Sequence, residues 1–270
     1  MKRLIAFDLD GTLAESKQPI DAEMGALLAR LTKATMVAVI SGGDWPQFEK
    51  QVVARLPADA DLERLYIQPT TGAKLYSFTP GGGWRAVYAE DFDKDERARI
   101  LSALDRAVGD TGLGHERTWG EQIEDRGSQI TFSGLGQQAP LDAKKAWDPD
   151  FAKRKRLQAA LRETLPDLSV NIGGSTSIDI TRAGVDKGYG LRKLADHLRI
   201  GFAEMLFVGD AVYPGGNDYP AKEAGVETIA VRDVAETKKV IEVAAACLAS
   251  WEISIAAVPA AGPAQRKSSC

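Results

Sequence analysis

Carboxylate and hydroxyl side chains stand directly after three short apolar runs of this 270-residue sequence. Asp8 and Asp10 follow the first run, Ser41 follows the second and Asp210 follows the third. Carboxylates that crowd together repel one another unless a cation lies among them, and a small number of hard oxygen ligands suits Mg²⁺. One carboxylate can attack phosphorus, and a second one two residues along an extended strand can serve as general acid and then base. These residue types therefore indicate metal-assisted phosphoryl transfer.

Further polar residues fit the same chemistry. Lys187 begins a predicted helix before the strand that delivers Asp210, and Asn217 and Asp218 follow that strand in a Gly-rich turn. A lysine ammonium and a serine hydroxyl beside a metal neutralise the charge of a phosphoryl group in transfer. Taken alone, Lys187 is explained as a surface lysine and the Ser41 segment as a helix N-cap. Their joint occurrence, each after the right strand, is what favours a catalytic site.

The elements that must position these residues alternate between strands and helices. This alternation favours an α/β fold with a parallel, Rossmann-like sheet covered by helices on both faces. Ligands of such sheets bind beyond the carboxyl ends of the strands, where the polar residues would converge. The expected strands are Leu4–Phe7, Met36–Ile40, Leu65–Gln68, Ala73–Phe78, Met205–Val208 and Thr228–Val231, and the expected helices are Asp21–Leu31, Trp45–Leu56, Lys187–Leu198, Tyr219–Ala224 and Ala235–Trp251.

The middle of the chain has a different sequence pattern, in which amphipathic helices lie beside strands that alternate polar and apolar residues. This pattern predicts an inserted α+β domain. We expect residues 1–81 and 184–256 to form the core domain, residues 82–183 the inserted domain, and residues 257–270 a disordered tail. Linkers near Pro80–Gly83 and Arg182–Val185 would act as hinges. The elements expected in the insertion are the helices Phe92–Val108 and Phe151–Thr164 and the strands Gln129–Ser133, Leu168–Ile172 and Thr176–Thr181, the last two as a hairpin.

The composition excludes two classes of partner. The formal net charge is -4, so the chain offers no basic field to hold nucleic acid. No stretch approaches the roughly 20 apolar residues of a membrane span, and the apolar run at the N-terminus is too short for a signal peptide. We therefore expect a cytoplasmic protein, monomeric or homodimeric, that neither enters a membrane nor binds nucleic acid.

The motifs together resemble those of the haloacid-dehalogenase (HAD) superfamily, and they span nearly the whole chain. The resemblance implies Asp8 as nucleophile and Asp10 as acid and base, with Ser41 and Lys187 on the phosphoryl oxygens. It also implies Mg²⁺ as cofactor, held by Asp8, the Asp10 carbonyl and Asp210. The remaining residues that we expect in the site are Asp218 at the metal, and Gly42 and Asn217 at the substrate.

The middle and second half are similar to the eukaryotic-type phosphomannomutases, whose inserted domain, or cap, follows the third core strand. The resemblance is carried by Arg126-Gly127, Gly173–Asp179, Asp186-Lys187 and Gly209–Asp218. In that family the cap arginines grip the sugar's distal phosphate, and the Ser and Asp of the Gly-Gly hairpin contact hydroxyls. By this resemblance Lys17, Arg126, Ser177 and Asp179 would bind substrate.

Two departures from the mutases bear on the reaction. Glutamine stands in the stretch Ile130–Pro140 where an arginine is expected, and Lys17 stands where the mutases have an arginine. A mutase must hold a bisphosphorylated intermediate, which calls for a bidentate second phosphate site that arginine supplies and glutamine does not. We therefore expect a Mg²⁺-dependent phosphatase acting on a sugar phosphate, with phosphomannomutase as the alternative.

Two more hypotheses are weaker. A non-catalytic sugar-phosphate binder is disfavoured because the nucleophile Asp8 is present. Dehalogenation is disfavoured because the Asp10 acid/base and the metal carboxylates serve phosphoryl transfer.

Overall fold

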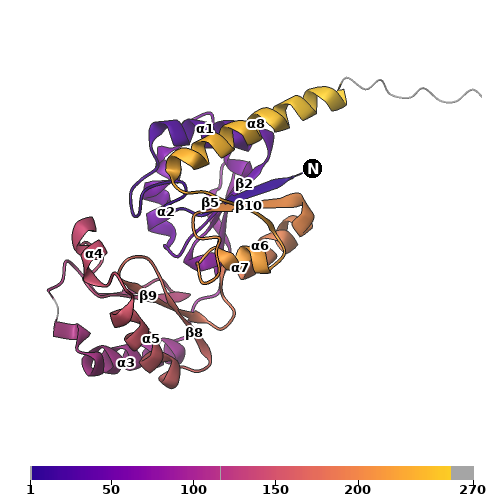
Figure 1. Cartoon of the computed structure of the whole chain (residues 1–270). Coiled ribbons are helices and arrows are strands. Elements are labelled where there is room, and N and C mark those ends of the chain that lie inside the picture. Colours follow the sequence, from indigo (N-terminus) through magenta and orange to yellow (C-terminus); the bar gives the residue numbers. More distant parts are fainter. Residues whose placement is uncertain (1, 116, 257–270) are drawn as a thin grey trace, which may run out of the picture.

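The computed structural model describes residues 2–115 and 117–256, which fold around two sheets (Figure 1). The larger one, the core sheet, has seven strands in the order β11-β10-β1-β2-β3-β4-β5. Neighbouring strands from β11 to β3 pair in parallel, whereas β4 and β5 form an antiparallel edge. The strands are β1 (Leu4–Phe7), β2 (Met36–Ile40), β3 (Leu65–Gln68), β4 (Lys74–Thr79), β5 (Gly83–Ala89), β10 (Met205–Gly209) and β11 (Glu227–Ala230).

Helices cover both faces of the core sheet, which explains why its central strands are unbroken apolar runs. In β1, Ile5 and Phe7 point into one hydrophobic cluster, while Leu4 and Ala6 point into another on the opposite face. The first cluster lies under α1 (Ala22–Ala34), α2 (Trp45–Gln51) and α8 (Val234–Ala256), and the second under α6 (Lys187–Leu198) and α7 (Tyr219–Glu223).

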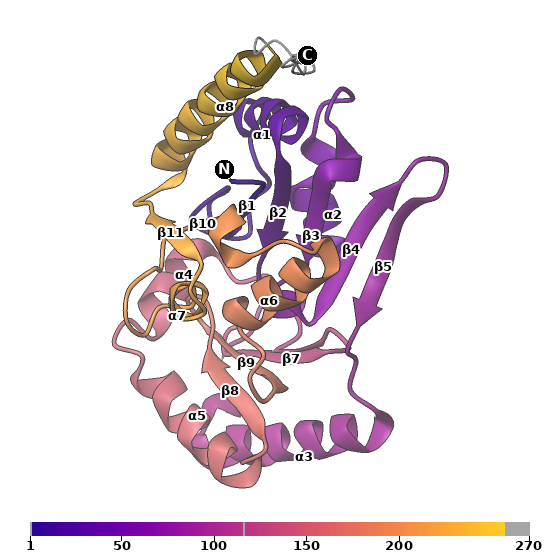
Figure 2. The ribbon, with the colours of Figure 1, turned by 90° about the vertical axis from the view of Figure 1, so that its right-hand side faces the viewer.

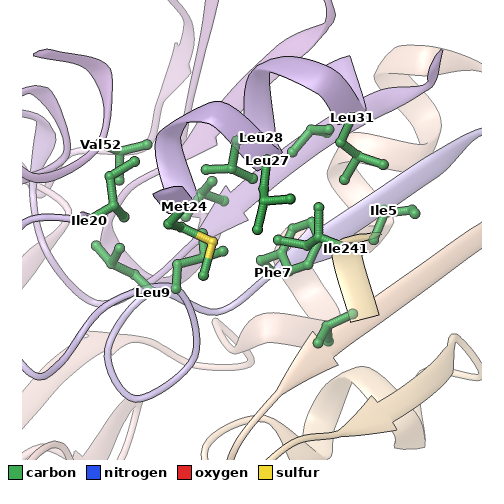
Figure 3. Packing of buried hydrophobic residues seen from close by; sticks show 14 of the residues in the cluster. Ile5, Phe7, Leu9, Ile20, Met24, Leu27, Leu28, Leu31, Val52 and Ile241 are labelled. Carbon is green, nitrogen blue, oxygen red and sulfur yellow. The ribbon is translucent and has the colours of Figure 1, made fainter. Parts of the chain in front are cut away.

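The packing of α1 and α8 fixes one side of β1. Figure 3 shows Leu27 of α1, Phe7 of β1 and Ile241 of α8 side by side. All three side chains are at most 7% exposed. Burying one such side chain stabilises a fold by about 1.5–3 kcal/mol, so β1 is a rigid support for the residues that follow it.

The second sheet is the centre of the cap, which we define as residues 94–182. Its strands pair antiparallel in the order β6-β7-β9-β8, and two long helices pack on one face. Figure 2 shows these helices, α3 and α5, on the side of the cap sheet away from the core. The cap elements are α3 (Lys94–Thr111), β6 (Ile123–Asp125), β7 (Gln129–Ser133), α4 (Leu141–Trp147), α5 (Ala152–Thr164), β8 (Leu168–Ile172) and β9 (Ser177–Arg182).

The expected fold class, an α/β core with an inserted α+β cap, is confirmed. The expected first hinge is wrong, because Pro80–Gly83 turns between β4 and β5 within the core sheet. Gly81 and Gly83 adopt positive φ there, which allows a tight hairpin and also looks like a linker in sequence. The expected boundary at residue 81 therefore falls inside a hairpin, and residues 83–89 belong to the core sheet.

The two chain crossings between core and cap lie side by side. Arg182, at the end of β9, donates hydrogen bonds to the carbonyl oxygens of Glu90 (2.9 Å) and Asp91 (3.0 Å) on the other crossing. Its guanidinium also pairs with Glu96 of α3. The second expected hinge, Arg182–Val185, thus coincides with one of these crossings.

Other expected elements lie where the sequence placed them, with ends that differ by a few residues. The short elements β6 and α4 were not expected, nor was β5. The expected disordered tail, residues 257–270, lies outside the described residues. Among the described helices, none combines the length and the apolar character needed to cross a membrane.

Candidate active site

Three carboxylates meet at the carboxyl ends of two adjacent core strands. Asp8 follows β1, while Asp210 and Asp218 lie in the segment after β10. One oxygen of each lies within 4.8 Å of the others. Asp8 and Asp218 are buried and Asp210 is exposed, so the cluster opens to solvent on the Asp210 side.

Lys187 is the counter-charge of this cluster. It is the first residue of α6, whose N-cap Asp186 accepts a hydrogen bond from the Tyr189 amide. Its ammonium lies 2.5 Å from Asp8 Oδ1 and also pairs with Asp218 Oδ1. The other oxygen of Asp218 accepts from the Ala211 amide at 2.9 Å, so Asp218 positions both Lys187 and the Asp210 loop.

The electrostatics of the cluster favour a further cation. Burial raises the pKa of the Asp8 carboxyl to about 8; the Lys187 ammonium opposes this rise, and Asp218 adds to it. Burial opposes the charge of Lys187, but the two carboxylates outweigh it and raise the pKa of the ammonium. One ammonium among three carboxylates leaves an excess of negative charge, and oxygen ligands in this arrangement fit Mg²⁺.

The loop after β1 requires glycine at residue 11. Gly11 has a φ of +90°, and a Cβ there would lie 2.6 Å from Asp210 Oδ2. Thr12 is fully buried and its hydroxyl approaches Asp210 Oδ1 at 3.4 Å. The Asp-Gly-Thr sequence therefore lets the β1 loop approach the loop after β10.

Asp10 is held by the backbone of the same loop. Its Oδ1 accepts from the Lys17 amide at 2.6 Å, where Lys17 has a left-handed φ of 59°. The Lys17 ammonium donates to Gln137 Oε1 of the cap at 3.1 Å. Lys17 therefore connects the expected acid/base residue to the cap.

Lys144 is a site residue that we did not predict. This lysine of α4 is 9% exposed and donates to the Gln137 carbonyl at 3.2 Å. Burial, with repulsion from the Lys17 ammonium, lowers its pKa to about 8. Two lysines thus meet at Gln137, where the sequence suggested a lack of positive charge. The sequence feature that could have identified Lys144 is the pair Lys144-Lys145 just after the glutamine stretch. Only the fold shows that Lys144 is the buried member of the pair.

Ser41 lies in the loop after β2, next to β1 in the sheet. The loop is bonded to η3 (Thr70–Gly72), a 3₁₀ turn. The Thr71 amide of this turn donates to the Ser41 carbonyl at 2.9 Å. The Gly42 carbonyl accepts two hydrogen bonds from the cap, from Arg126 Nη1 at 2.5 Å and Gln129 Nε2 at 3.1 Å. The structure therefore brings the cap into direct contact with this loop.

The cap presents a polar face to the core because its strands alternate. Ile130 and Ile178 point toward α3 and α5, whereas Gln129, Ser177 and Asp179 lie on the other face. Asp179 accepts from Thr131 Oγ1 at 2.8 Å, and burial raises its pKa against the opposing charge of Arg126.

The expected residues thus fall into three groups. Asp8, Lys187, Asp210 and Asp218 form one contact cluster, with Asp10 and Ser41 on the adjoining loops. The cap contributes Arg126, Ser177 and Asp179, and Lys17 reaches the cap from the core. Asn217 is exposed beside Asp218 and lies outside the carboxylate cluster.

Comparison with known sequences identifies relatives over most of the chain. A family model for eukaryotic phosphomannomutase matches residues 24–244, a stretch that begins after the β1 loop. A phosphomannomutase of Encephalitozoon cuniculi (strain GB-M1) is 30% identical over 230 residues, covering 81% of this chain and 83% of the relative. A phosphomannomutase of Dendrobium officinale is 27% identical over 226 residues, covering 82% of this chain and 85% of the relative.

Solved structures share the fold at lower identity. Plasmodium falciparum IMP-nucleotidase superposes with a TM-score of 0.70 at 16% identity, covering 92% of this chain and 69% of that chain. A trehalose-6-phosphate phosphatase related protein gives 0.55 at 18% identity, covering 92% of this chain and 99% of that chain. The fold is therefore that of HAD-type proteins.

Substituting Gly11 tests whether the close approach to Asp210 supports metal binding. We expect Gly11→Ala to weaken Mg²⁺ binding at least tenfold, measured by isothermal titration calorimetry, because the Cβ would displace the Asp210 carboxylate. Gly81→Ala is the control, since Gly81 also has positive φ but a Cβ there meets nothing within 4 Å. Equal Mg²⁺ affinity in Gly11→Ala and wild type would show that Asp210 is not a metal ligand.

Proposed function

We propose that this chain, which belongs to the eukaryotic phosphomannomutase family, is a Mg²⁺-dependent phosphohydrolase that removes phosphate from a sugar phosphate. The family and the HAD fold make it a phosphoryl-transfer enzyme. The observation that carries the proposal is the buried Asp8–Lys187–Asp218 cluster with Asp210 beside it. This chemistry needs a carboxylate nucleophile, a lysine that binds the phosphoryl oxygens and further carboxylates that bind a cation.

Asp8, Asp210 and the backbone carbonyl of Asp10 would hold the Mg²⁺, with Asp218 at the edge of the set. Both oxygens of Asp218 already accept hydrogen bonds, which suits it to orient Lys187. When bound, the ion neutralises charge on the phosphoryl oxygens and on the nucleophile.

The protein groups perform two displacements in sequence. An oxygen of Asp8 attacks phosphorus in line, the bond from phosphorus to the sugar oxygen breaks, and Asp10 donates its proton to the leaving alcohol. Asp10, now a carboxylate, removes a proton from water, which attacks phosphorus and releases phosphate from Asp8. Lys187 and Ser41 donate hydrogen bonds to the phosphoryl oxygens in both steps.

The polar face of the cap supports a hydroxyl-rich substrate. Buried atoms there that have no hydrogen-bond partner in the described residues include Arg126 Nε, Gln129 Oε1 and Gln137 Nε2. Buried polar atoms are nearly always paired, so these donors and the acceptor favour a ligand that carries both kinds of group. A sugar phosphate does, with Ser177 and Asp179 as further partners.

Two features favour hydrolysis over mutase chemistry. Gln137 offers no charge in the stretch where the resemblance to the mutases leads us to expect an arginine, and Arg126 already uses donors on Gly42 and Glu124. Lys17 brings a point charge in place of a bidentate fork. A hydrolase needs only one phosphate site and access for water.

A second candidate function, phosphomannomutase, is favoured by one observation: the lysine pair at Gln137. The ammonium groups of Lys17 and Lys144 converge there on the cap side of Asp10. Together they provide positive charge for a second phosphate even though no arginine fork is formed.

The decisive assay measures phosphate release from a panel of sugar phosphates with Mg²⁺, beside isomerisation of mannose 1-phosphate to mannose 6-phosphate with added hexose 1,6-bisphosphate. We expect free phosphate without isomerisation. Isomerisation with little phosphate release would replace the hydrolase by the mutase. Neither activity on any sugar phosphate would contradict the proposed substrate class.

Lys144→Gln separates the two candidates further. In a hydrolase of monophosphates we expect less than about a threefold change in kcat/KM. A mutase would lose more than tenfold, since a charge-assisted hydrogen bond to phosphate contributes about 1.5–3 kcal/mol. In that case wild-type isomerisation would also fall as the pH rises through about 8, where Lys144 loses its proton. Lys145→Gln is the control, because Lys145 is its exposed neighbour on α4.

The two loop carboxylates have separable roles. We expect Asp8→Asn to abolish turnover with the fold intact, and Asp10→Asn to slow it by roughly 10²–10⁴-fold, the usual contribution of general acid–base catalysis. Steady-state kinetics and circular dichroism of both variants check this. Turnover by Asp8→Asn near the wild-type rate would rule out the nucleophile assignment.

A further inference from the structure

The cap touches the core through the turn that joins β6 to β7, residues 126–128. Ser128 Oγ lies 2.7 Å from Thr70 Oγ1 of the core, and both side chains are buried. Arg126 reaches the Gly42 carbonyl from the same turn. The amide of Phe92, on the first chain crossing, donates to the Gly127 carbonyl at 3.0 Å. We call this set of contacts the seam.

Lys74 is a second charged residue at the seam, beside Arg126, and the reaction described above does not use it. It lies on β4 of the core and is 7% exposed. Its ammonium donates to the Arg126 carbonyl of the cap at 2.6 Å and to Asp44 Oδ1 of the core at 3.1 Å. Asp91, on the first crossing, lies 3.6 Å away. One buried ammonium therefore bridges core, crossing and cap.

We propose that Lys74 is a positioning residue that holds the cap closed and seats Arg126 against the Gly42 carbonyl. The bond from Lys74 fixes the backbone of Arg126, and that backbone sets the direction of the guanidinium. Gly42 follows Ser41, so the closed cap also contacts the loop that carries Ser41.

On the core side of the seam, one turn contacts both the cap and the Ser41 loop. Thr70 and Thr71 have left-handed φ values of 49° and 59°, an uncommon and strained conformation for a β-branched residue. The turn keeps this conformation while its amides bond the Ser41 loop: Thr70 to the Gly43 carbonyl at 2.8 Å, and Thr71 to the Ser41 carbonyl at 2.9 Å. The Thr70 hydroxyl bonds the cap. Cap and catalytic loop thus share one strained turn.

The consequence for the reaction is a dependence on substrate. A substrate that contacts the polar face of the cap binds the closed state. Its apparent affinity therefore becomes weaker when a smaller fraction of the enzyme is closed. An aryl phosphate without sugar hydroxyls gains nothing from closure. This consequence rests on the proposed function. The holding of the cap by Lys74, which we call the latch, does not.

The first test is kinetic and uses Lys74→Met, which keeps the length of the side chain and removes its charge. We expect KM for the best sugar phosphate to rise about tenfold with kcat within threefold, and both constants for p-nitrophenyl phosphate to stay within threefold. Lys33→Met is the matched control, since Lys33 also pairs with an aspartate, Asp59, but belongs to α1. Figure 2 shows α1 on the side of the core away from the cap. Equal KM values for the sugar phosphate in Lys74→Met and wild type would overturn the proposal, as would equal losses on both substrates.

The second test needs no activity, so it separates failure of the latch from failure of the proposed function. Amide hydrogen exchange of the peptides covering residues 41–44 and 126–131 should quicken at least tenfold in Lys74→Met, and not in Lys33→Met. Ser128→Ala, which removes the cap's hydroxyl from the seam, should quicken the same peptides even if Lys74→Met does not fold. Exchange at the wild-type rate in these peptides would contradict the latch whatever the enzyme acts on.

Discussion

A single buried ammonium lies among the carboxylates at the centre of the site, and the surrounding structure is arranged around it. Lys187 bridges Asp8 and Asp218, which approach it from different strands of the core sheet. Breaking a buried ion pair by removing one partner costs about 3–5 kcal/mol, so the lysine secures both loops. Asp210 adds a third carboxylate that Lys187 does not contact, and a divalent cation is the group that would balance it.

The cap completes this site through strand alternation and one turn. Ile130 and Phe132 of β7 and Ile178 and Ile180 of β9 pack against the cap helices. The residues between them form a polar face directed toward the core. The turn at residues 126–128 then fixes this face against the Ser41 loop through side-chain and backbone bonds. The cap and the Ser41 loop therefore share a short set of hydrogen bonds at the seam.

The sequence predicts well which core side chains lie close together and poorly which side chains join the cap to the core, for a physical reason. Asp8, Ser41 and Asp210 each follow an apolar strand, and parallel strands bring their ends to one edge. Lys74 and Lys144 act across the join between core and cap, where the direction of a side chain depends on how the two parts pack. The strand β5 was missed because its residues are mostly exposed and its Gly-rich turn resembles a linker. Short β6 and α4 carry too few residues for a periodic pattern.

Phosphoryl transfer through Asp8 is tested most directly by rapid acid quenching of the enzyme during turnover with Mg²⁺ and a phosphate ester, followed by mass spectrometry of its peptides. The mechanism predicts one phosphoryl group on the peptide that contains Asp8, appearing within a turnover and lost when substrate is exhausted. A phosphoryl group on another residue, or turnover at full rate with no modified peptide at any quench time, would contradict it.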